Sequence, residues 1–375
     1  MFNSSLINDL NTLFSPVSSY KKIIAAVSGG SDSIALMFLL HEWLNQSPTG
    51  PHVNIVTIDH GLRKQSSQEV RWVRQTSLSL GFKHYTKIWE NENKQKSAHS
   101  ARSARYELLI QQAREVKASI ILLGHTRNDQ AETILMRSLR VNNQSGTLGL
   151  SGMSSKSSYE EISLYRPLLN YDRIDIRNYL KTQSQGWIDD PTNENRNYER
   201  VRARQALSTS SHFPSVKMIA RFAELNNKTR LWMNRKICPF LEKNVWKTKS
   251  DSLIFSNSQS LPLAILVNCF SILIQLAGDQ NYRPPERKVI AVAKSYKQGE
   301  KRKFSVGRCL ITIRNSEVKF EFEHRRQLKV PQSREGKEIS VRPLQRFRSQ
   351  SDDLLYQYAL RMIKKYDKLV SLKLE

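Results

Sequence analysis

Apolar and polar positions alternate in blocks over the first third of the chain, and each block has the length of one strand or one helix. Short apolar runs of the β type occur at 23–27, 52–60, 82–89 and 120–123. Segments with helical apolar spacing follow them, at 31–40, 66–80, 97–116 and 129–139. This alternation predicts an α/β fold, a doubly wound, Rossmann-like parallel sheet with helices on both faces.

The next stretch of the chain is more polar. Residues 141–158 are rich in Ser, Gly and Asn and predict a surface loop, whereas 172–181 predicts a helix. Residues 186–195 are rich in turn-forming residues, and several arginines follow them. We therefore expect this stretch to complete the first domain.

The strand–helix alternation ends near Pro214. Residues 216–246 predict one long helix or two, 261–277 an apolar helix and 309–322 a pair of strands, which together indicate an α+β domain. The expected domains are 1–212 with the parallel sheet, 213–335 as a smaller basic α+β domain, and 336–375 as a partly helical tail.

Charge sets the class of partner. The chain has 59 Lys and Arg against 34 Asp and Glu, a formal net charge of +25, which favours a polyanionic partner such as nucleic acid. Eight of these cations lie within 282–303, where a nucleic-acid contact and a merely solvated face are both open.

Three features bear on the compartment. The apolar segment 261–277 is too short and too polar for a bilayer span, so no membrane partner is expected. Residues 1–10 lack the pattern of a secretory signal. The three scattered cysteines, Cys238, Cys269 and Cys309, suggest reduced thiols and hence a cytoplasmic protein.

The segment SGGSDS at 28–33 separates the first strand from the first helix. Backbone N–H groups at the start of a helix, two glycines without Cβ atoms and neighbouring hydroxyls form a cradle for phosphate. A plain helix cap is the alternative, but the position, directly after a buried strand, is where α/β sheets bind ligands. Asp32 beside a phosphate predicts a magnesium ion between them.

Two further clusters follow later strands. Asp129 and Glu132 lie three apart at a helix start after His125, so with Asp32 they predict a magnesium site for ATP, although a solvated acidic face is the alternative. Arg102 and Arg105 share another helical face, where they either stabilise charge on a phosphate or pair with a surface carboxylate.

Several motifs resemble one family when they are taken in order. They are SGGSDS at 28–33, DHGLR at 59–63, Ala101-Arg102 with Arg105-Tyr106, GHTRNDQAET at 124–133, RPLL at 166–169 and DPTN at 190–193. SGGSDS resembles the PP-loop of ATP pyrophosphatases. The whole set resembles the tRNA(Ile)-lysidine synthetase family over roughly residues 20–205, and more loosely to about 330.

The resemblance implies ligation of free L-lysine to C2 of the wobble cytidine of the isoleucine tRNA with a CAU anticodon. The reaction would use ATP and magnesium and pass through an adenylated base, releasing AMP and pyrophosphate. A homodimer is also compatible with the sequence.

The expected site residues fall into three groups. The expected catalytic residues are Asp32, Arg105, His125, Asp129 and Glu132. The expected ATP-binding residues are Ser28, Gly29, Gly30, Ser31, Asp32 and Ser33. The expected substrate-binding residues are Asp59, His60, Arg63, Arg196, Arg200, Arg202, Lys301, Arg302 and Lys303.

The chain departs from the family pattern in three places. Asn128-Asp129 stands where the family usually has two acidic residues, the loop after Arg140 is longer, and the tail beyond 336 does not clearly match. Because Asp129 holds the position that the resemblance marks as catalytic, we expect activity to survive.

Rival functions each leave something unexplained. A tRNA thiolase, the main alternative, needs a reactive cysteine pair or an iron–sulfur site, and no cysteine precedes Cys238. An amidotransferase would need an N-terminal cysteine, but Phe2 follows Met1. A non-enzymatic RNA-binding protein would account for the charge and leave SGGSDS without a purpose.

Overall fold

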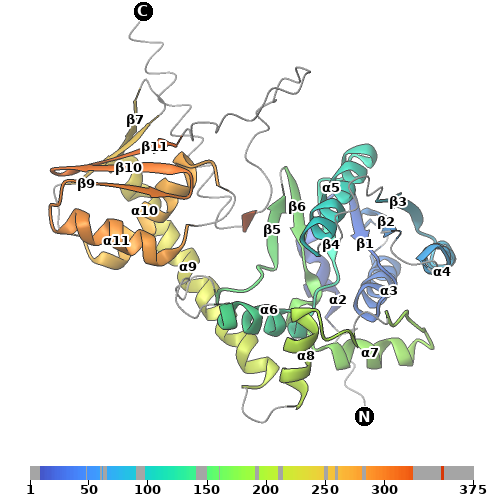
Figure 1. Cartoon of the computed structure of the whole chain (residues 1–375). Coiled ribbons are helices and arrows are strands. Elements are labelled where there is room, and N and C mark those ends of the chain that lie inside the picture. The colour runs from blue at the N-terminus through green and yellow to red at the C-terminus, as the bar shows by residue number, and fades with distance from the viewer. Residues whose placement is uncertain are drawn as a thin grey trace, which may run out of the picture. The chain divides into compact units, whose positions relative to one another are not determined.

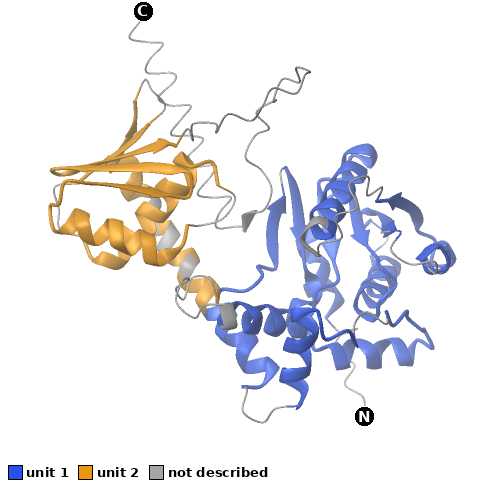
Figure 2. Ribbon diagram, in the orientation of Figure 1, with its two compact units in different colours: residues 1–138, 151–225 blue, residues 139–150, 226–375 orange. Residues whose placement is uncertain are grey.

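The computed structural model describes residues 9–47, 49–59, 61, 66–89, 98–140, 150–159, 161–190, 194–209, 214–248, 252–257, 261–280, 284–323 and 348–349. The chain forms two compact units, residues 1–138 with 151–225 and residues 139–150 with 226–375 (Figure 1, Figure 2). The boundary near residue 225 lies within the helix α9 (Val216–Asn244). The predicted domain limits at 212 and 335 stay predictions.

Five parallel strands form the centre of the first unit. They are β1 (Lys22–Ala26), β2 (His52–Asp59), β3 (Lys83–Ile88), β4 (Ile120–Leu123) and β6 (Ile162–Tyr165). Their spatial order is β6-β4-β1-β2-β3, so the chain builds outward from β1 first on one side and then on the other. The predicted doubly wound parallel sheet is confirmed, and its topological switch point lies between β1 and β4.

Helices cover both faces of this sheet (Figure 1). They are α2 (Leu10–Phe14), η1 (Ser15–Val17), α3 (Ser31–Gln46), α4 (Ser66–Ser79), α5 (Ala98–Val116), α6 (Arg127–Arg140), η3 (Pro167–Asn170), α7 (Arg173–Thr182) and α8 (Glu199–Thr209). On one face, Ile23 and Ala25 of β1 join a core with α2, α3 and α7. Ile24 between them is fully buried on the other face, where α5 crosses the strands.

Continuous apolar sequence explains why the central strands were predictable. All four residues of β4 are buried, and α3 buries nine of its sixteen residues. A strand that is covered on both faces needs apolar side chains at every position and not only at alternate ones.

The predicted loop at 141–158 is wrong for its last part. Residues from 156 onward form β5 (Lys156–Tyr159), which pairs antiparallel with β6 and is the outermost strand that the first unit contributes. Residues 141–149 lie outside the described residues. The sequence Lys-Ser-Ser-Tyr has little apolar content, because only Ser158 and Tyr159 of this strand are buried.

The second unit is α+β, as predicted. Its antiparallel sheet has the order β7 (Val245–Lys247), β8 (Leu253–Ser256), β11 (Glu317–Phe322), β10 (Cys309–Arg314) and β9 (Arg302–Val306). The helices α10 (Leu263–Ala277) and α11 (Glu286–Lys297) pack together and share a core with these strands. A two-residue strand, β12 (Arg348–Ser349), is also described.

Two details of the second unit differ from the expectation. α9 is one helix and ends at Asn244, so Trp246 belongs to β7 and not to the predicted helix 216–246. The strands β7, β8 and β9 were not predicted. The paired strands expected at 309–322 are confirmed as β10 and β11, with Thr312 opposite Lys319.

Two of the three cysteines have described side chains. Cys269 and Cys309 are buried free thiols, and burial raises the pKa of Cys309 to about 12. No helix among the described residues combines the length and the apolar content that a membrane span requires.

Candidate active site

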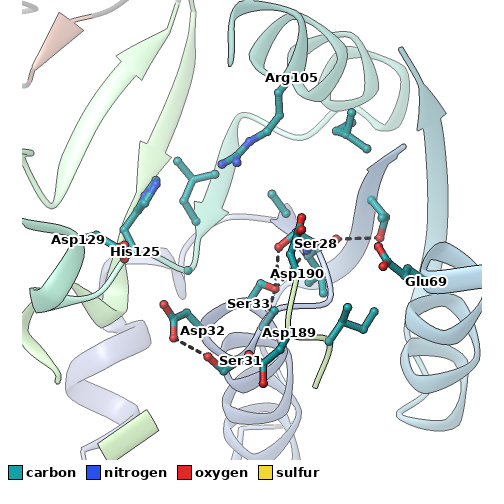
Figure 3. Close-up of a pocket in the computed structure, with 18 of the residues that line it drawn as sticks. Ser28, Ser31, Asp32, Ser33, Glu69, Arg105, His125, Asp129, Asp189 and Asp190 are labelled. Carbon is teal, nitrogen blue, oxygen red and sulfur yellow. Dashed lines mark hydrogen bonds between the residues drawn. The ribbon is translucent and has the colours of Figure 1, made fainter. Parts of the chain in front are cut away.

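A cavity of about 440 Å³ opens at the carboxyl ends of β1, β2 and β4, at the switch point of the sheet (Figure 3). The segment 28–33 forms one wall, Asp59 lies at the end of β2, and Gly124 and His125 follow β4. α4 contributes Glu69 from a further side. The volume suits a nucleotide-sized ligand.

The segment 28–33 is a tight turn with hydroxyl groups at its centre. The Ser33 hydroxyl donates to the carbonyl of Gly30 at 2.9 Å and accepts the backbone N–H of Ser28 at 3.1 Å. The backbone N–H of Ser33 also bonds to Gly30, which is the N-cap of α3. The first turn of α3 therefore faces the cavity with its positive dipole end, as the phosphate-cradle prediction requires.

Two glycines permit close approaches around this turn. Gly29 has φ +92°, and a Cβ atom there would lie 2.6 Å from Cδ1 of Ile188, whose N–H donates to the Gly29 carbonyl. A Cβ atom on Gly124 would lie 2.8 Å from the backbone oxygen of Asp32. The end of β4 thus packs directly on the start of α3, which brings His125 to the phosphate-binding turn.

Three carboxylates meet three guanidinium groups beside the cavity. Arg173, the first residue of α7, reaches Asp32 at 3.1 Å, Asp129 at 2.8 Å and Glu132 at 3.2 Å. From α8, Arg200 contacts Asp129 at 2.8 Å and Glu132 at 2.7 Å, and Arg204 contacts Glu132 at 2.8 Å. The Glu132 side chain is 1% exposed, so its charge is compensated by guanidinium groups and not by water.

Capping interactions hold this network in place. Asp129 accepts the backbone N–H of Thr126 at 2.7 Å and its hydroxyl at 3.0 Å, which fixes the start of α6. Asn128 accepts the backbone N–H of Arg173 at 2.8 Å and so fixes the start of α7. Asp129 therefore fixes the start of its own helix, α6, and its neighbour Asn128 fixes the start of α7.

A second group of cations consists of Arg102, Arg105 and Arg166, of which Arg105 lines the cavity. The guanidinium carbons of Arg102 and Arg105 lie 5.3 and 5.7 Å from the ring centre of the buried Tyr106. Arg166 is 5% exposed and donates to Ser154 and Ser157. The side chain of Arg105 therefore points toward the cavity, as Figure 3 shows.

Burial and charge shift the pKa values here. Burial lowers the pKa of His125 well below its usual 6.5, and the arginines at 166, 105, 102 and 200 add to the effect. Its imidazole is therefore neutral at neutral pH, and its Nδ1 has no partner among the described residues. Burial raises the pKa of Asp32, although Arg173 opposes the change.

The comparison with known families agrees with this geometry. A family model described as a PP-loop domain matches residues 2–210, more than half of the chain. The chain belongs to the PP-loop domain family. The matched range contains every element that lines the 440 Å³ cavity.

The PP-loop protein is similar to curated tRNA(Ile)-lysidine synthases. It is 38% identical to that of Bartonella tribocorum over 242 residues, which cover 50% of this chain and 49% of the relative. It is 42% identical to that of Bradyrhizobium diazoefficiens over 196 residues, covering 52% and 54%. The chain thus spans about half the length of the curated relatives it matches.

A solved structure shows the same fold. The U34-tRNA thiolase NcsA from Methanococcus maripaludis, determined with its [4Fe-4S] cluster, aligns with a TM-score of 0.51 and 14% identity. The alignment covers 60% of this chain and 79% of the thiolase. At this identity the likeness concerns the fold alone.

Magnesium fits the PP-loop site only in part. Among the described residues, no three His, Cys, Asp or Glu side chains are arranged to hold a metal ion. Asp129 and Glu132 are occupied by arginines, so the arrangement does not support the ligand roles predicted for them. Asp32 and Asp129 both line the cavity, but Asp32 contacts one arginine, at 3.1 Å through Oδ2, and its Oδ1 accepts only from the Ser31 hydroxyl at 3.0 Å among the described residues. One carboxylate together with ATP phosphates is a usual magnesium environment.

The expected substrate-binding residues are dispersed. Asp59 lines the cavity and accepts the Gly61 N–H, whereas His60 and Arg63 lie outside the described residues. Arg196 and Arg202 are exposed, and Arg202 donates to backbone carbonyls. Arg200 instead belongs to the carboxylate network, and the basic run 301–303 is exposed in the second unit.

Several contributors were not predicted from the sequence. Arg173 and Arg204 complete the carboxylate network, and Asp189 lines the cavity beside Ile188. The four-residue spacing of Arg200 and Arg204 on α8 is the one signal that indicates a shared face. Nothing local in the sequence pairs Arg173 with carboxylates about forty positions earlier.

Proposed function

We propose that this protein ligates L-lysine to C2 of the wobble cytidine of the tRNA(Ile) that carries a CAU anticodon. ATP would activate the cytidine, and AMP and pyrophosphate would be released. The observation that carries the proposal is the PP-loop turn at the switch point of the sheet, within a region 38–42% identical to tRNA(Ile)-lysidine synthases.

The site offers groups for each step of this reaction. The first turn of α3, with the segment 28–33, binds the phosphates of ATP. The C2 oxygen of the cytidine attacks the α-phosphorus, and the bond to pyrophosphate breaks. The lysine ε-amine then attacks C2, and the carbon–oxygen bond to AMP breaks.

In this scheme His125 and Arg105 act on the changes of charge. The attacking amine must be neutral and loses a proton as it bonds to C2. The neutral imidazole of His125, whose Nδ1 lacks a partner among the described residues, accepts a hydrogen bond from the amine and orients it. The proton itself leaves to water, because the surrounding arginines disfavour an imidazolium. The guanidinium of Arg105, which lines the cavity, stabilises the developing negative charge on phosphate oxygen.

Magnesium, when bound with ATP, would neutralise phosphate charge and make pyrophosphate a better leaving group. Asp32 is the carboxylate placed to hold it. Asp129 and Glu132 serve a different purpose in this scheme, because they position Arg173 and Arg200 beside the phosphates.

An omission assay tests the proposal. Pyrophosphate release is measured with ATP, the CAU tRNA and lysine, each left out in turn, and labelled lysine is followed into tRNA. We expect release that depends on tRNA and incorporation that depends on all three. Sulfur transfer to tRNA without lysine incorporation would instead establish a thiolase, and tRNA binding without pyrophosphate release would indicate a non-enzymatic protein.

A further inference from the structure

A second cavity, of about 770 Å³, lies at the amino ends of the parallel strands, the opposite edge of the sheet from the PP-loop. It is lined by the first residues of β1, β2 and β3, by the last turns of α3 and α5 and by the turn after α4. It is as large as many ligand-binding pockets, and nothing in the proposed reaction uses it.

The rim of this cavity is basic. Lys22, Lys83, Lys117 and His52 are all exposed there, and none of them has a carboxylate partner among the described residues. Lys87 provides the contrast, since it is held by Glu115 at 2.8 Å. Glu115, the acidic side chain that lines the cavity, is therefore already paired with Lys87. The four cations on the rim have no carboxylate partner among the described residues.

A buried amide lies at the floor of the same cavity. Asn54 on β2 is only 7% exposed, lines the cavity, and makes no side-chain hydrogen bond to any described residue. An amide that lines a cavity without a partner among the described residues is free to hydrogen-bond a ligand or an ordered water there. Strand register puts Asn54 beside Lys83 on one face of the sheet.

An aromatic ring completes the set. Tyr85 follows Lys83 by two residues, so it lies on the same face of β3, and it lines the cavity while half-buried. Lys22 and His52 are register partners on the neighbouring strands, on the face that Asn54 shares. Cations, an amide with a donor and an acceptor, and an aromatic ring are thus brought to one surface.

We propose that this cavity binds a phosphate-bearing nucleotide, either free or as part of an RNA strand. The lysines at 22, 83 and 117 would contact the phosphate, Asn54 would hydrogen-bond the polar edge of the base, and Tyr85 would pack against the ring. This site is separate from the PP-loop cavity and does not depend on the proposed ligase activity.

Equilibrium dialysis tests the proposal with the PP-loop site saturated by the ATP analogue AMPCPP. The probes are labelled UMP, for a free nucleotide, and the oligonucleotide U6, for an RNA strand. We expect about one mole of probe to bind per mole of protein. The double variant Lys22→Ala/Lys83→Ala and the variant Asn54→Leu should each weaken this binding by about tenfold or more.

Lys181→Ala is the matched control, because this exposed lysine in the last turn of α7 lines neither cavity; its affinity should stay within about twofold of wild type. The exposed lysine variants keep the test independent of any folding defect in Asn54→Leu. Tighter binding of U6 than of UMP identifies the ligand as RNA, and the reverse identifies a free nucleotide. Absence of binding of both probes to the wild type, or equal binding to the double-lysine variant, would overturn the proposal.

Discussion

Asp32 and Glu132 are carboxylates of the same network in very different states. Glu132 accepts from three arginines and is almost wholly buried, whereas Asp32 contacts one arginine and keeps a 17% exposed side chain on the cavity. A buried carboxylate with several guanidinium partners is a structural anchor, since removing one member leaves an uncompensated charge. Asp32 is the one available for a ligand.

Asp32→Asn should therefore stop adenylation without harming tRNA binding. The change removes a negative charge at the phosphate cradle and leaves the hydrogen-bonding shape nearly intact. We expect pyrophosphate release to fall by about a hundredfold or more, while the Kd for tRNA stays close to wild type. Glu161→Gln, which alters an exposed pair with Arg114, is the control. Release at the wild-type rate from Asp32→Asn would remove Asp32 from the proposed chemistry.

His125 should make the fold sensitive to acid. Above about pH 6.5 the imidazole is neutral in both the folded and the unfolded chain, so it has no effect on stability. As the pH falls further, the unfolded chain takes up a proton that the folded chain, with its lowered pKa, does not. The free energy of unfolding therefore decreases by up to about 1.4 kcal/mol per pH unit.

Urea unfolding of the wild type and of His125→Gln at pH 7.5 and 5.5 measures this effect. The loss of stability between the two pH values should be about 1 kcal/mol smaller in the variant. Gln111→Ala, an exposed substitution that removes no titratable group, should behave like the wild type. Identical pH dependence in His125→Gln and wild type would show that the imidazole is protonated in the folded protein.

At the scale of elements, the site depends on where α7 starts. Its N-cap residue, Asp172, makes no side-chain capping bond, and the first N–H of the helix is instead bonded by Asn128 of α6. Arg127 adds a salt bridge to Asp172 at 2.6 Å. Arg127 and Asn128 of α6 thus position Arg173 at the start of α7. Asn128, which stands where an acidic residue is usual, therefore affects the carboxylate network through Arg173.

The variants Asn128→Asp and Asn128→Leu separate the charge of this side chain from its role as an acceptor. Asp keeps an acceptor at a helix N-terminus, so we expect nearly unchanged pyrophosphate release. Leu leaves the N–H of Arg173 unsatisfied, which should cost about 1 kcal/mol of stability and about tenfold in rate. Thermal unfolding and release kinetics measure the two effects. Equal activity of the Leu and wild-type proteins would show that Arg173 is positioned without Asn128, and a large gain in Asn128→Asp would show that the missing carboxylate limits the rate.

The sequence predicted those elements whose residue pattern alone determines them. β4 was predictable because all four of its residues are apolar. The SGGSDS turn and the spacing of residues 125, 129 and 132 were predictable because each lies within a few consecutive residues of one strand end and the helix that follows it. β5 was missed because only two of its four residues are buried, so it needs few apolar side chains. α8 was missed because its arginines at 200 and 204 face carboxylates that lie about seventy positions earlier in the chain. The four-residue spacing of these arginines indicates a shared helical face, but nothing in the sequence shows which carboxylates that face contacts.

At the scale of the whole molecule, the charge of +25 predicted a polyanionic partner, but the total does not say which surface contacts it. In the second unit, strand alternation separates Arg302 from Lys303, and Lys301 lies just before the strand. Val306 and Phe304 of β9 face the core of that unit, so Arg302 lies on the same face, and Arg302 packs over the Phe304 ring at 5.2 Å. Lys303 lies on the outer face, in register with Thr312 and Lys319.

This alternation sharpens the test of tRNA binding by the basic run. If the outer face of the sheet contacts tRNA phosphates, each lost contact releases fewer counterions and flattens the plot of log affinity against log salt by about one unit. Lys301→Ala/Lys303→Ala should therefore lower the slope by about two units, and raise the tRNA concentration for half-maximal rate without changing the rate at saturation. Arg302→Ala, on the opposite face, is the matched control and should leave the slope close to wild type. An unchanged slope in the double variant would show that these lysines do not contact tRNA. Equal effects of all three positions would show that the tRNA contacts both faces of β9.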